Sequence, residues 1–141
     1  MAMTMHVDIV SAEQEIYSGT VEEVHAPAEM GSLGIMPRHS PLVARLKAGE
    51  VRVKPAGKDE MISIFVSGGI VEIQPHIVTV LADTGMRAGD LDEAAALEAK
   101  KRAEALLADK EGSVDFVKAK LELLSSIQQL DMIRKYRKKG R

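Results

Sequence analysis

Residue types that could support chemistry occur in this chain, but not at the spacings that chemistry requires. The chain contains no cysteine, which excludes disulfides, thiolate zinc sites and cysteine nucleophiles. Its four histidines are scattered, and none lies four residues from another, as the histidines of a helical metal site do: His6, His25, His39 and His76. We therefore expect neither a bound metal nor an organic cofactor.

Motifs for phosphate binding and nucleophilic catalysis are also missing. The sequence has no G-x-x-x-x-G-K-S/T or G-x-G-x-x-G run, and no serine in a G-x-S-x-G elbow. Gly68 and Gly69 follow a strand-like run and are typical of a tight turn. Asp90, Asp92 and Glu93 stand where a helix is expected to begin, so capping and the helix dipole account for them. The sequence predicts no enzymatic activity.

The spacing of apolar residues changes once along the 141-residue chain. Up to about residue 81, they form short strand-length runs cut by Gly and Pro; from residue 91 to about residue 133, they follow helical spacing. The strand-like runs are too close together for crossover helices, so we expect antiparallel pairing. The predicted fold is α+β, with an N-terminal antiparallel β-sandwich followed by a C-terminal antiparallel two-helix hairpin.

This pattern predicts four segments: a sandwich over residues 1–85, a hinge over 86–90, a helix–loop–helix over 91–138 and a basic tail over 139–141. Residues 77–81 are nearly all apolar, so this strand is expected to be covered on both faces. The strands expected are residues 5–10, 15–18, 21–26, 33–36, 42–46, 50–53, 61–66, 70–73 and 77–81.

In the helical part, Asp90 followed by Glu93 forms a capping-box pattern, and Gly112 and Ser113 are expected to end one helix and cap the next. The first helix is rich in alanine, which buries little apolar area, so we expect the hairpin to dock weakly. A weakly docked hairpin is suited to a switch. The second helix is expected to bury one stripe, from which Leu123 and Met132 are excluded: Val114, Val117, Leu121, Leu124, Ile127, Leu130 and Ile133.

Basic residues are concentrated at the C-terminal end, whereas the rest of the chain is acidic: Arg134, Lys135, Arg137, Lys138, Lys139 and Arg141. This cluster indicates either an acidic partner or a solvated helix end near its negative dipole pole. Nucleic acid is not expected, because only Tyr136 is near enough to stack with bases. Direct membrane insertion is not expected either, because no run reaches about 18 apolar residues and the N-terminus lacks signal-peptide features.

Three stretches carry a specific pattern: residues 31–42 (GSLGIMPRHSPL), 65–75 (FVSGGIVEIQP) and 78–83 (VTVLAD). They closely resemble one family, the epsilon subunit of the rotary, proton-translocating ATP synthase, bacterial type. Residues 7–13 (VDIVSAE) and 91–94 (LDEA) also fit, and the resemblance covers essentially the whole chain.

The resemblance implies a non-catalytic central-stalk subunit at the cytoplasmic face of a bacterial plasma membrane. The implied partners are the gamma shaft, the ring of c subunits and the alpha/beta catalytic head. The sandwich would couple ring rotation to the head, and a mobile hairpin would inhibit ATP hydrolysis. The ring-contact residues implied are Gly31, Ser32, Arg38 and His39, and those facing the catalytic subunits are Arg134, Lys135, Arg137 and Lys138.

The nucleotide-binding motif of some family members is incomplete in this chain. That motif reads I/L-D-x-x-R-A, and here Ala95 replaces its arginine; Ser125 and Gln129 stand where strong ATP binders have further arginines. Asp92 and Arg102 remain, but a triphosphate requires several cationic or backbone donors. We predict very weak or no ATP binding, to be measured by calorimetry. The rival functions are a free-standing ATP or ligand sensor and a nucleic-acid module acting through residues 134–141.

Overall fold

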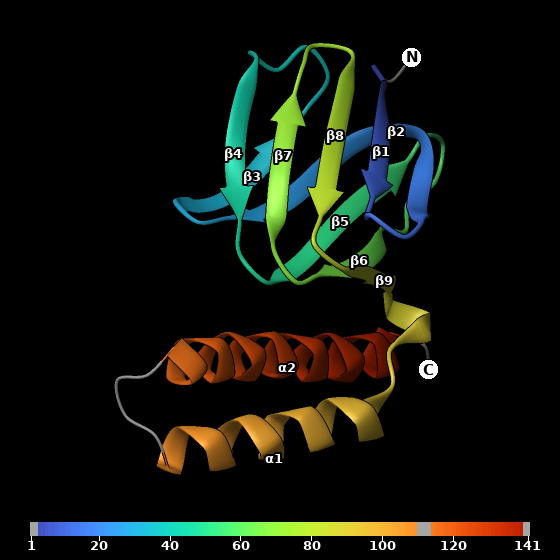
Figure 1. Cartoon of the computed structure of the whole chain (residues 1–141). Coiled ribbons are helices and arrows are strands. Elements are labelled where there is room, and N and C mark those ends of the chain that lie inside the picture. The colour runs from blue at the N-terminus through green and yellow to red at the C-terminus, as the bar shows by residue number, and fades with distance from the viewer. Residues whose placement is uncertain (1–2, 110–113, 140–141) are drawn as a thin grey trace. The chain divides into compact units, whose positions relative to one another are not determined.

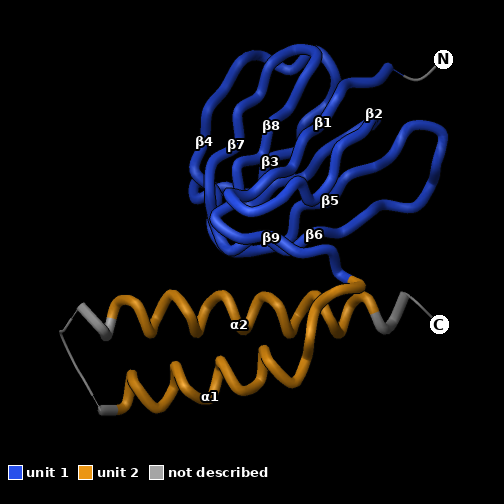
Figure 2. The backbone as a smooth tube through the Cα atoms, turned by 45° about the vertical axis from the view of Figure 1, so that its right-hand side comes forward, with its two compact units in different colours: residues 1–88 blue, residues 89–141 orange. Residues whose placement is uncertain are grey.

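The chain forms two compact units, residues 1–88 and residues 89–141, which Figure 2 distinguishes by colour. The computed structural model describes residues 3–109 and 114–139. The strands belong to the first unit and the two long helices to the second (Figure 1). The predicted α+β fold, a β-sandwich followed by a two-helix hairpin, is therefore confirmed.

The strands of the first unit form one continuous sheet that folds into two layers (Figure 1). The order is β1-β8-β7-β4-β2-β5-β6-β9, with β3 attached to β2. Their bounds are β1 (Met5–Val10), β2 (Glu15–Ala28), β3 (Gly31–Ile35), β4 (Leu42–Leu46), β5 (Gly49–Pro55), β6 (Ile62–Val66), β7 (Gly69–Ile73), β8 (Ile77–Ala82) and β9 (Gly85–Arg87).

The long strand β2 connects the two layers. Its first half pairs with β1, and its second half pairs with β5 and β3. The expected break at Gly19 and the expected stop at Pro27 are therefore wrong, because the strand runs through both positions. Gly19 keeps its ladder partner Val7, so a glycine inside a well-paired strand does not end it.

The sheet is mixed rather than purely antiparallel, because β1 and β8 run parallel, with Val7 opposite Val78. Residues 11–76 separate these two strands along the chain, so no short connection restricts their relative direction. The expectation that β8 is covered on both faces is also wrong. Val78 and Val80 are fully buried, whereas Leu81 on the opposite face is 49% exposed.

The core between the layers consists mainly of β-branched aliphatic side chains. They alternate along the strands with outward-facing residues, as the pleat requires. Gly69, which opens β7, has a φ of +139°, and a Cβ there would collide with the backbone carbonyl oxygen of Leu81. The largest fully buried side chains are Ile9, Ile35, Ile64, Ile73, Val7, Val21, Val24, Val51, Val53, Val66, Val71 and Val78.

The short strand β9 lies at the start of the segment expected to be the hinge. It pairs with β6 at the sheet edge, and the Arg87 side chain holds its end in place. The Arg87 Nε donates a hydrogen bond of 3.2 Å to the carbonyl oxygen of Ile16. The guanidinium also lies 5.6 Å from the centre of the Tyr17 ring, within cation–π range. The first unit therefore remains ordered as far as Arg87, just before the division after Ala88.

The second unit contains α1 (Glu93–Asp109) and α2 (Val114–Lys139), which pack along each other after a short 3₁₀ turn, η1 (Ala88–Asp90). The capping-box pattern had predicted Asp90 as the helix cap, but the residue that caps α1 is Asp92. Asp92 Oδ1 accepts hydrogen bonds from the backbone N–H groups of Ala94, at 3.0 Å, and Ala95, at 3.3 Å. The expected features at Gly112 and Ser113 lie outside the described residues.

The buried face of α2 differs from the predicted stripe. Val117, Leu121 and Leu124 are 59%, 62% and 48% exposed, although the stripe was expected to be buried. Three residues turn an α-helix by about 300°, which is about 60° short of a full turn. The predicted stripe advances in steps of three between Leu124 and Ile133, and it therefore rotates around the helix. The buried or half-buried residues instead follow alternating steps of four and three: Ala119, Leu123, Ser126, Leu130 and Ile133.

The buried face of α1 is made of alanine, with Ala96 and Ala103 almost completely covered. Small side chains on both helices permit a close approach. Ala119 and Ser126 therefore lie on the face of α2 that packs against α1. Leu123 and Met132, which the stripe excluded, are half-buried and buried respectively. The hydroxyl of buried Ser126 donates to the carbonyl oxygen of Glu122 at 2.9 Å, a local bond that slightly disfavours the helix.

Candidate functional site

The four residues expected to contact a ring occupy two places rather than one loop. Gly31 and Ser32 begin β3, whereas Arg38 and His39 lie in the segment between β3 and β4. Residues 33–37, which include the last three residues of β3, lie between the two pairs. All except the half-buried His39 are exposed. A partner that contacts both pairs must therefore extend along the whole of β3.

Arg38 adopts a left-handed backbone conformation, which is uncommon for a residue with a side chain. Its φ is +66°, the only positive φ of a non-glycine residue in the described ranges. The backbone is held there by a hydrogen bond of 2.8 Å from the Arg38 N–H to the Pro75 carbonyl oxygen. Such a conformation costs about 1–2 kcal/mol for an L-residue. The surrounding segment thus imposes a strained conformation on an exposed cation.

His39 is fixed within the same segment. Its backbone N–H donates to the Met36 carbonyl oxygen at 3.2 Å, and its Nδ1 lies 2.6 Å from the Ser40 carbonyl oxygen. A carbonyl oxygen can only accept, so Nδ1 carries the hydrogen. The neutral ring therefore has its acceptor at Nε2. In this form, His39 can receive a hydrogen bond from a partner while Arg38 donates one.

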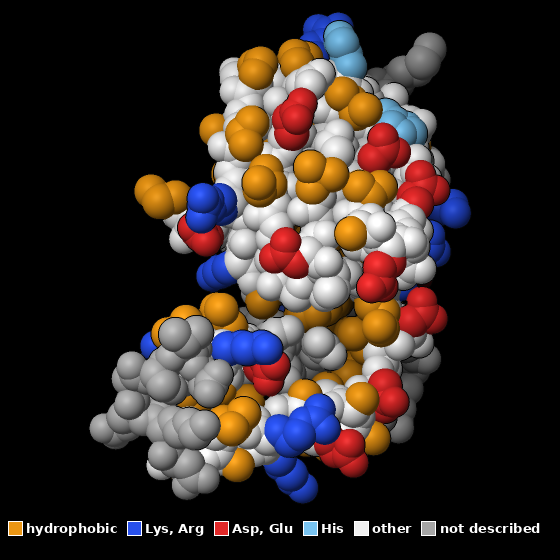
Figure 3. Space-filling view, in the orientation of Figure 1, with side chains coloured by type: hydrophobic (Ala, Val, Ile, Leu, Met, Phe, Trp, Pro, Cys, Tyr) orange, Lys and Arg blue, Asp and Glu red, His pale blue; other side chains and the backbone are white. Residues whose placement is uncertain are grey.

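The outer face of β4, β7 and β8 carries exposed apolar side chains. Val43, Ile70 and Leu81 are 66%, 42% and 49% exposed, and the ladder sets Ile70 directly opposite Leu81. Hydrophobic side chains gather over these strands in Figure 3, with acidic ones among them. Apolar groups grouped on one face indicate a surface that another protein covers. We call Val43, Ile70 and Leu81 the outer apolar face.

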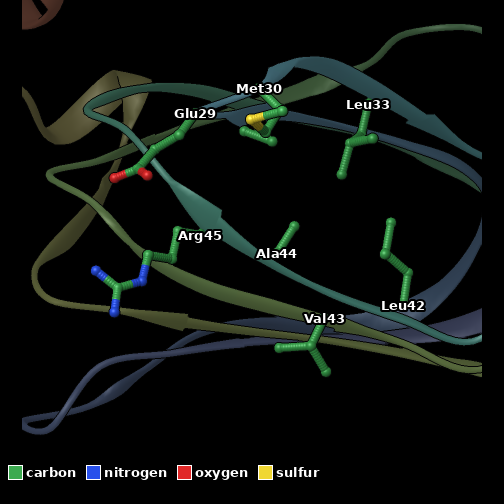
Figure 4. A pocket seen from close by; sticks show the side chains of 8 residues that line it. Glu29, Met30, Leu33, Leu42, Val43, Ala44 and Arg45 are labelled. Carbon is green, nitrogen blue, oxygen red and sulfur yellow. The ribbon is translucent and has the colours of Figure 1, made fainter.

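A groove opens between β3 and β4, beside the outer apolar face. It has a volume of about 340 Å³. In Figure 4, Leu33 points into it from β3, Leu42 and Ala44 point into it from β4, and Val43 points away. The residues that line it are Ala28, Glu29, Met30, Leu33, Leu42, Val43, Ala44 and Arg45. The alternation of apolar and polar residues in these short strands gave no sign of the groove, which depends on how the strands diverge.

A cluster of His6, Asp8 and Ser18 crosses β1 and β2, and the sequence analysis missed it. Asp8 Oδ1 accepts a hydrogen bond of 2.7 Å from the Ser18 hydroxyl and lies 2.9 Å from His6 Nε2. Ser18 and His6 together hold the pKa of Asp8 below its usual value, with the Ser18 hydrogen bond contributing most and partial burial opposing them. Strand alternation already placed His6 and Asp8 on one face, but only the ladder brings Ser18 alongside.

This cluster does not have the geometry of a catalytic triad. In a triad, the two ring nitrogens of histidine bind different partners, and the serine hydroxyl donates to the imidazole. Here Asp8 and Ser18 both approach the same nitrogen of His6, at 2.9 and 3.2 Å, and the Ser18 hydroxyl donates to the carboxylate instead. The arrangement therefore joins two strands and does not activate the serine.

Of the basic residues expected to face the catalytic subunits, Arg134 and Lys135 are exposed near the end of α2. Arg137 and Lys138 belong to the same helix, but their side chains lie outside the described residues. Nearby, the Tyr136 hydroxyl lies within 3.5 Å of the position that a Cβ on Gly89 would occupy. The described cations thus project from a helix end that packs close to the start of the second unit.

The residues left from the nucleotide-binding motif do not form a phosphate site in this structure. The Asp92 carboxylate is occupied in capping α1, where it accepts from Ala94 and Ala95. Arg102 and Ala95 are exposed on the same helix. A capping carboxylate repels a triphosphate and uses the first-turn N–H groups that could otherwise bind one.

Two family descriptions together match nearly the whole chain. Residues 4–88 match the family described as "ATP synthase, Delta/Epsilon chain, beta-sandwich domain", and residues 90–134 match "ATP synthase, Delta/Epsilon chain, long alpha-helix domain". The boundary between the matches agrees with the division of the structure after Ala88. The chain belongs to the delta/epsilon chain family of ATP synthases. In that family the delta/epsilon chain is an accessory subunit and not a catalytic one.

Similar bacterial proteins extend over the same length. The chain is 61% identical over 140 residues to the ATP synthase epsilon chain of Nitrosococcus oceani, covering 99% of both chains. It is 58% identical over 141 residues to that of Thioalkalivibrio sulfidiphilus, covering 100% of both. The resemblance identified from residues 31–42, 65–75 and 78–83 is therefore confirmed.

Solved structures share the fold at low sequence identity. A chain of the Euglena gracilis mitochondrial ATP synthase matches 98% of this chain and 82% of its own length, with a TM-score of 0.69 and 14% identity. A chain from the central stalk and c-ring of the Tetrahymena thermophila enzyme matches 94% of this chain and 96% of its own, with a TM-score of 0.58 and 14% identity. Within the described ranges, no helix is both long and apolar enough to cross a membrane.

Proposed function

We propose that this chain is the epsilon-type subunit of a bacterial ATP synthase central stalk. It couples proton-driven rotation of the ring to ATP synthesis and restrains ATP hydrolysis through its helical hairpin. The main support is the match of both structural units, in order, to the two delta/epsilon family descriptions. The proposed location is the cytoplasmic face of the plasma membrane, where the subunit is bound peripherally through its partners.

The gamma shaft is the proposed partner of the outer apolar face. Val43, Ile70 and Leu81 lie on adjacent paired strands, and all are at least 42% exposed. Burying apolar area contributes about 25 cal/mol per Å², so covering this face favours association. The acidic side chains that lie among the hydrophobic ones in Figure 3 would then help to set the orientation of the partner.

The c-subunit ring is the proposed partner of Gly31, Ser32, Arg38 and His39. Arg38 donates through its exposed guanidinium, and His39 accepts at Nε2, which suits polar loops that carry both carbonyl and N–H groups. Holding the strained backbone of Arg38 in place before binding reduces the ordering that binding requires. The pair that begins β3 and the pair in the segment after β3 would rest on the ring together.

The hairpin is the proposed regulatory part. The buried residues of its first helix are alanines within the described part of the chain, and the exposed stripe of Val117, Leu121 and Leu124 on its second helix is available to an apolar partner. We propose that the hairpin leaves the sandwich and that Arg134 and Lys135 then meet an acidic segment of the alpha/beta catalytic head. Two poses of similar free energy would be biased by these partner contacts.

The first test of the assignment is a pull-down of the tagged full-length chain from its native membranes. Recovery of the gamma and catalytic subunits is the expected result. If the folded, tagged chain recovers no ATP synthase component, the assignment to the central stalk is wrong.

The inhibitory role is tested by charge reversal in the reconstituted complex. The double variant Arg134→Glu/Lys135→Glu should raise the rate of ATP hydrolysis relative to the wild-type complex. Lys101→Glu, which reverses an exposed charge on α1, is the matched control and should leave the rate unchanged. Equal hydrolysis rates in all three complexes would contradict inhibition through the end of α2.

A further inference from the structure

Arg87 ends β9 and fastens this strand to a distant part of the sandwich. Its Nε donates a hydrogen bond of 3.2 Å to the carbonyl oxygen of Ile16, which lies 71 residues earlier in the chain. The same guanidinium lies 5.6 Å from the centre of the Tyr17 ring, within the range of a cation–π interaction. One side chain therefore makes two attractive contacts with the start of β2.

The acceptor of this hydrogen bond belongs to a β-bulge. The ladder between β1 and β2 shifts register between Ile9 and Val10, and Ile16 is the extra residue on β2. A bulge leaves its extra residue without a partner and disrupts the ladder locally. Arg87 bonds to the carbonyl of that residue, and a charged donor makes a stronger hydrogen bond than a neutral one. The bulge thus provides a specific attachment point for the end of β9.

The rest of β9 is fitted to the same place. A Cβ on Gly85 would overlap the Cδ1 methyl of Ile16, so only a glycine permits this close approach. Just before β9, the Thr84 hydroxyl donates to the Ser67 hydroxyl oxygen at 2.8 Å, and the Thr84 N–H donates to the same oxygen at 3.0 Å. The strand itself pairs with β6 over only three residues. Because so short a ladder has few backbone hydrogen bonds, these side-chain contacts decide whether β9 stays attached.

The second unit begins only two residues after Arg87. Gly89 belongs to that unit, and the Tyr136 hydroxyl near the end of α2 lies within 3.5 Å of the position that a Cβ on Gly89 would occupy. Arg87 is thus fastened within the first unit, and Gly89 packs within the second. Ala88 alone lies between them.

We propose that Arg87 is a lock that confines the hinge of this chain to Ala88. With the lock closed, a change of orientation between the units must come from rotation about the backbone bonds of residues 87–89. With the lock open, β9 can detach from β6, which adds residues 85–87 and about 10 Å to the connection. The hinge expected over residues 86–90 is then reduced to its central residue.

A hinge of one residue restricts how the hairpin can move. Hinges are commonly a few residues that absorb large changes of φ and ψ, and here the lock leaves one such residue. A short connection also keeps the hairpin at a high effective concentration near its target, which a longer and looser one would lower. This consequence for regulation rests on the proposed function, whereas the lock itself does not.

Hydrogen exchange of the isolated full-length chain tests the lock, through peptides that cover residues 62–66 and 84–88. Arg87→Ala removes both contacts, so exchange of the amides that pair β6 with β9 should rise about tenfold. Met86→Ala, which shortens an exposed side chain on the same strand, is the matched control and should stay within about twofold of wild type. Exchange in β7 and β8 should be unchanged in both variants. Equal exchange of the two variants at residues 62–66 and 84–88 would contradict the lock.

Trypsin digestion tests the same contacts with Arg87 left in place. The protease must accept the arginine side chain in its specificity pocket, so the lock should slow cleavage between residues 87 and 88. Tyr17→Leu removes the aromatic face and should speed this cleavage about threefold, because the hydrogen bond to Ile16 remains. Tyr17→Phe keeps the ring and is the matched control, with cleavage at the wild-type rate. Equal cleavage of the two variants would show that the ring does not hold Arg87, and it would overturn the lock as proposed.

Discussion

The two units of this chain have different kinds of buried residue in their interiors. The sandwich buries long rows of Ile and Val, of which Ile9, Ile64 and Val51 are fully inaccessible. The first helix of the hairpin buries alanine, with Ala103 as its most covered residue, whereas the second helix also buries Leu130 and Ile133. Each buried methylene contributes about 0.8 kcal/mol, so a buried Ile or Val of the sandwich contributes more than a buried alanine of α1.

This difference matches the two roles proposed for the chain. A coupling element must transmit torque without deforming, and close-packed aliphatic cores are stiff. A regulatory element must be able to change pose, and low-stability elements supply such movements. The buried hydroxyl of Ser126, bonded to its own helix, weakens the hairpin further.

The largest effect should come from a cavity in the sandwich. Ile64→Ala removes three carbons from a fully buried side chain and should lower the free energy of unfolding by about 3 kcal/mol. Urea unfolding of the full-length chain measures it. Ile70→Ala, on an exposed position of the same layered sheet, should cost less than about 1 kcal/mol and serves as the control. Similar losses of unfolding free energy in both variants would contradict the idea that the buried aliphatic core stabilises the sandwich.

The hairpin should respond to added volume more than to lost volume. Ala103→Leu inserts a large side chain where an alanine is fully buried, and it should destabilise the helix pair by about 2 kcal/mol. Hydrogen exchange of α1 and α2 should rise while that of the sandwich stays unchanged. Ala105→Leu, at an exposed position of the same helix, is the control. Faster exchange throughout the sandwich would contradict the independence of the two units.

A smaller effect is expected at the strained Arg38. Arg38→Gly relieves the left-handed conformation but increases the freedom of the unfolded chain, so the net stabilisation should be about 0.5 kcal/mol. Arg38→Lys keeps the backbone cost and should change nothing in the isolated chain. Thermal unfolding measures both variants. A gain with lysine equal to that with glycine would show that the side chain, and not the backbone, is the source of the strain.

The smallest effect should be the pH dependence at Asp8. Its pKa is lowered in the folded state from the ordinary value of 3.8, so its contribution to stability is present above that value. The contribution is lost as the pH falls through the lower, folded-state pKa. Asp8→Asn should therefore be less stable than wild type near neutral pH, and the difference should shrink below about pH 4. A constant difference in unfolding midpoint at all pH values would contradict this sign.

Local patterns were sufficient for most of the strands and for the order of the two units. Alternation predicted residues 5–10, and a short run before a turn signal predicted residues 42–46, at the bounds that the structure has. The family resemblance identified the candidate contact residues, but not that they occupy two places. The groove and the His6–Asp8–Ser18 cluster were missed, because both depend on strands that are distant in the sequence.

Helix faces were harder to predict because α2 has apolar residues around much of its circumference. Two stripes were available, one through Val117 and Leu121 and one through Ala119 and Leu123. The size of the side chains decided between the two stripes. The alanine face of α1 allows α2 to approach closely, and this favours the stripe that contains the small Ala119. The cap at Asp92 was missed for a similar reason: Asp90 and Asp92 are both good caps, and the short 3₁₀ turn moved the helix start.

By itself, the sequence determined the change from strand to helix, the division into two units and membership of the family, because periodicity and motifs are local properties. Only the tertiary structure decided that β1 and β8 run parallel, that β2 serves both layers and that the side between β3 and β4 stays open. These features depend on which distant strands meet, and pairing between distant strands is set by the shape of the whole core. The same reason brings Leu33 opposite Leu42 (Figure 4).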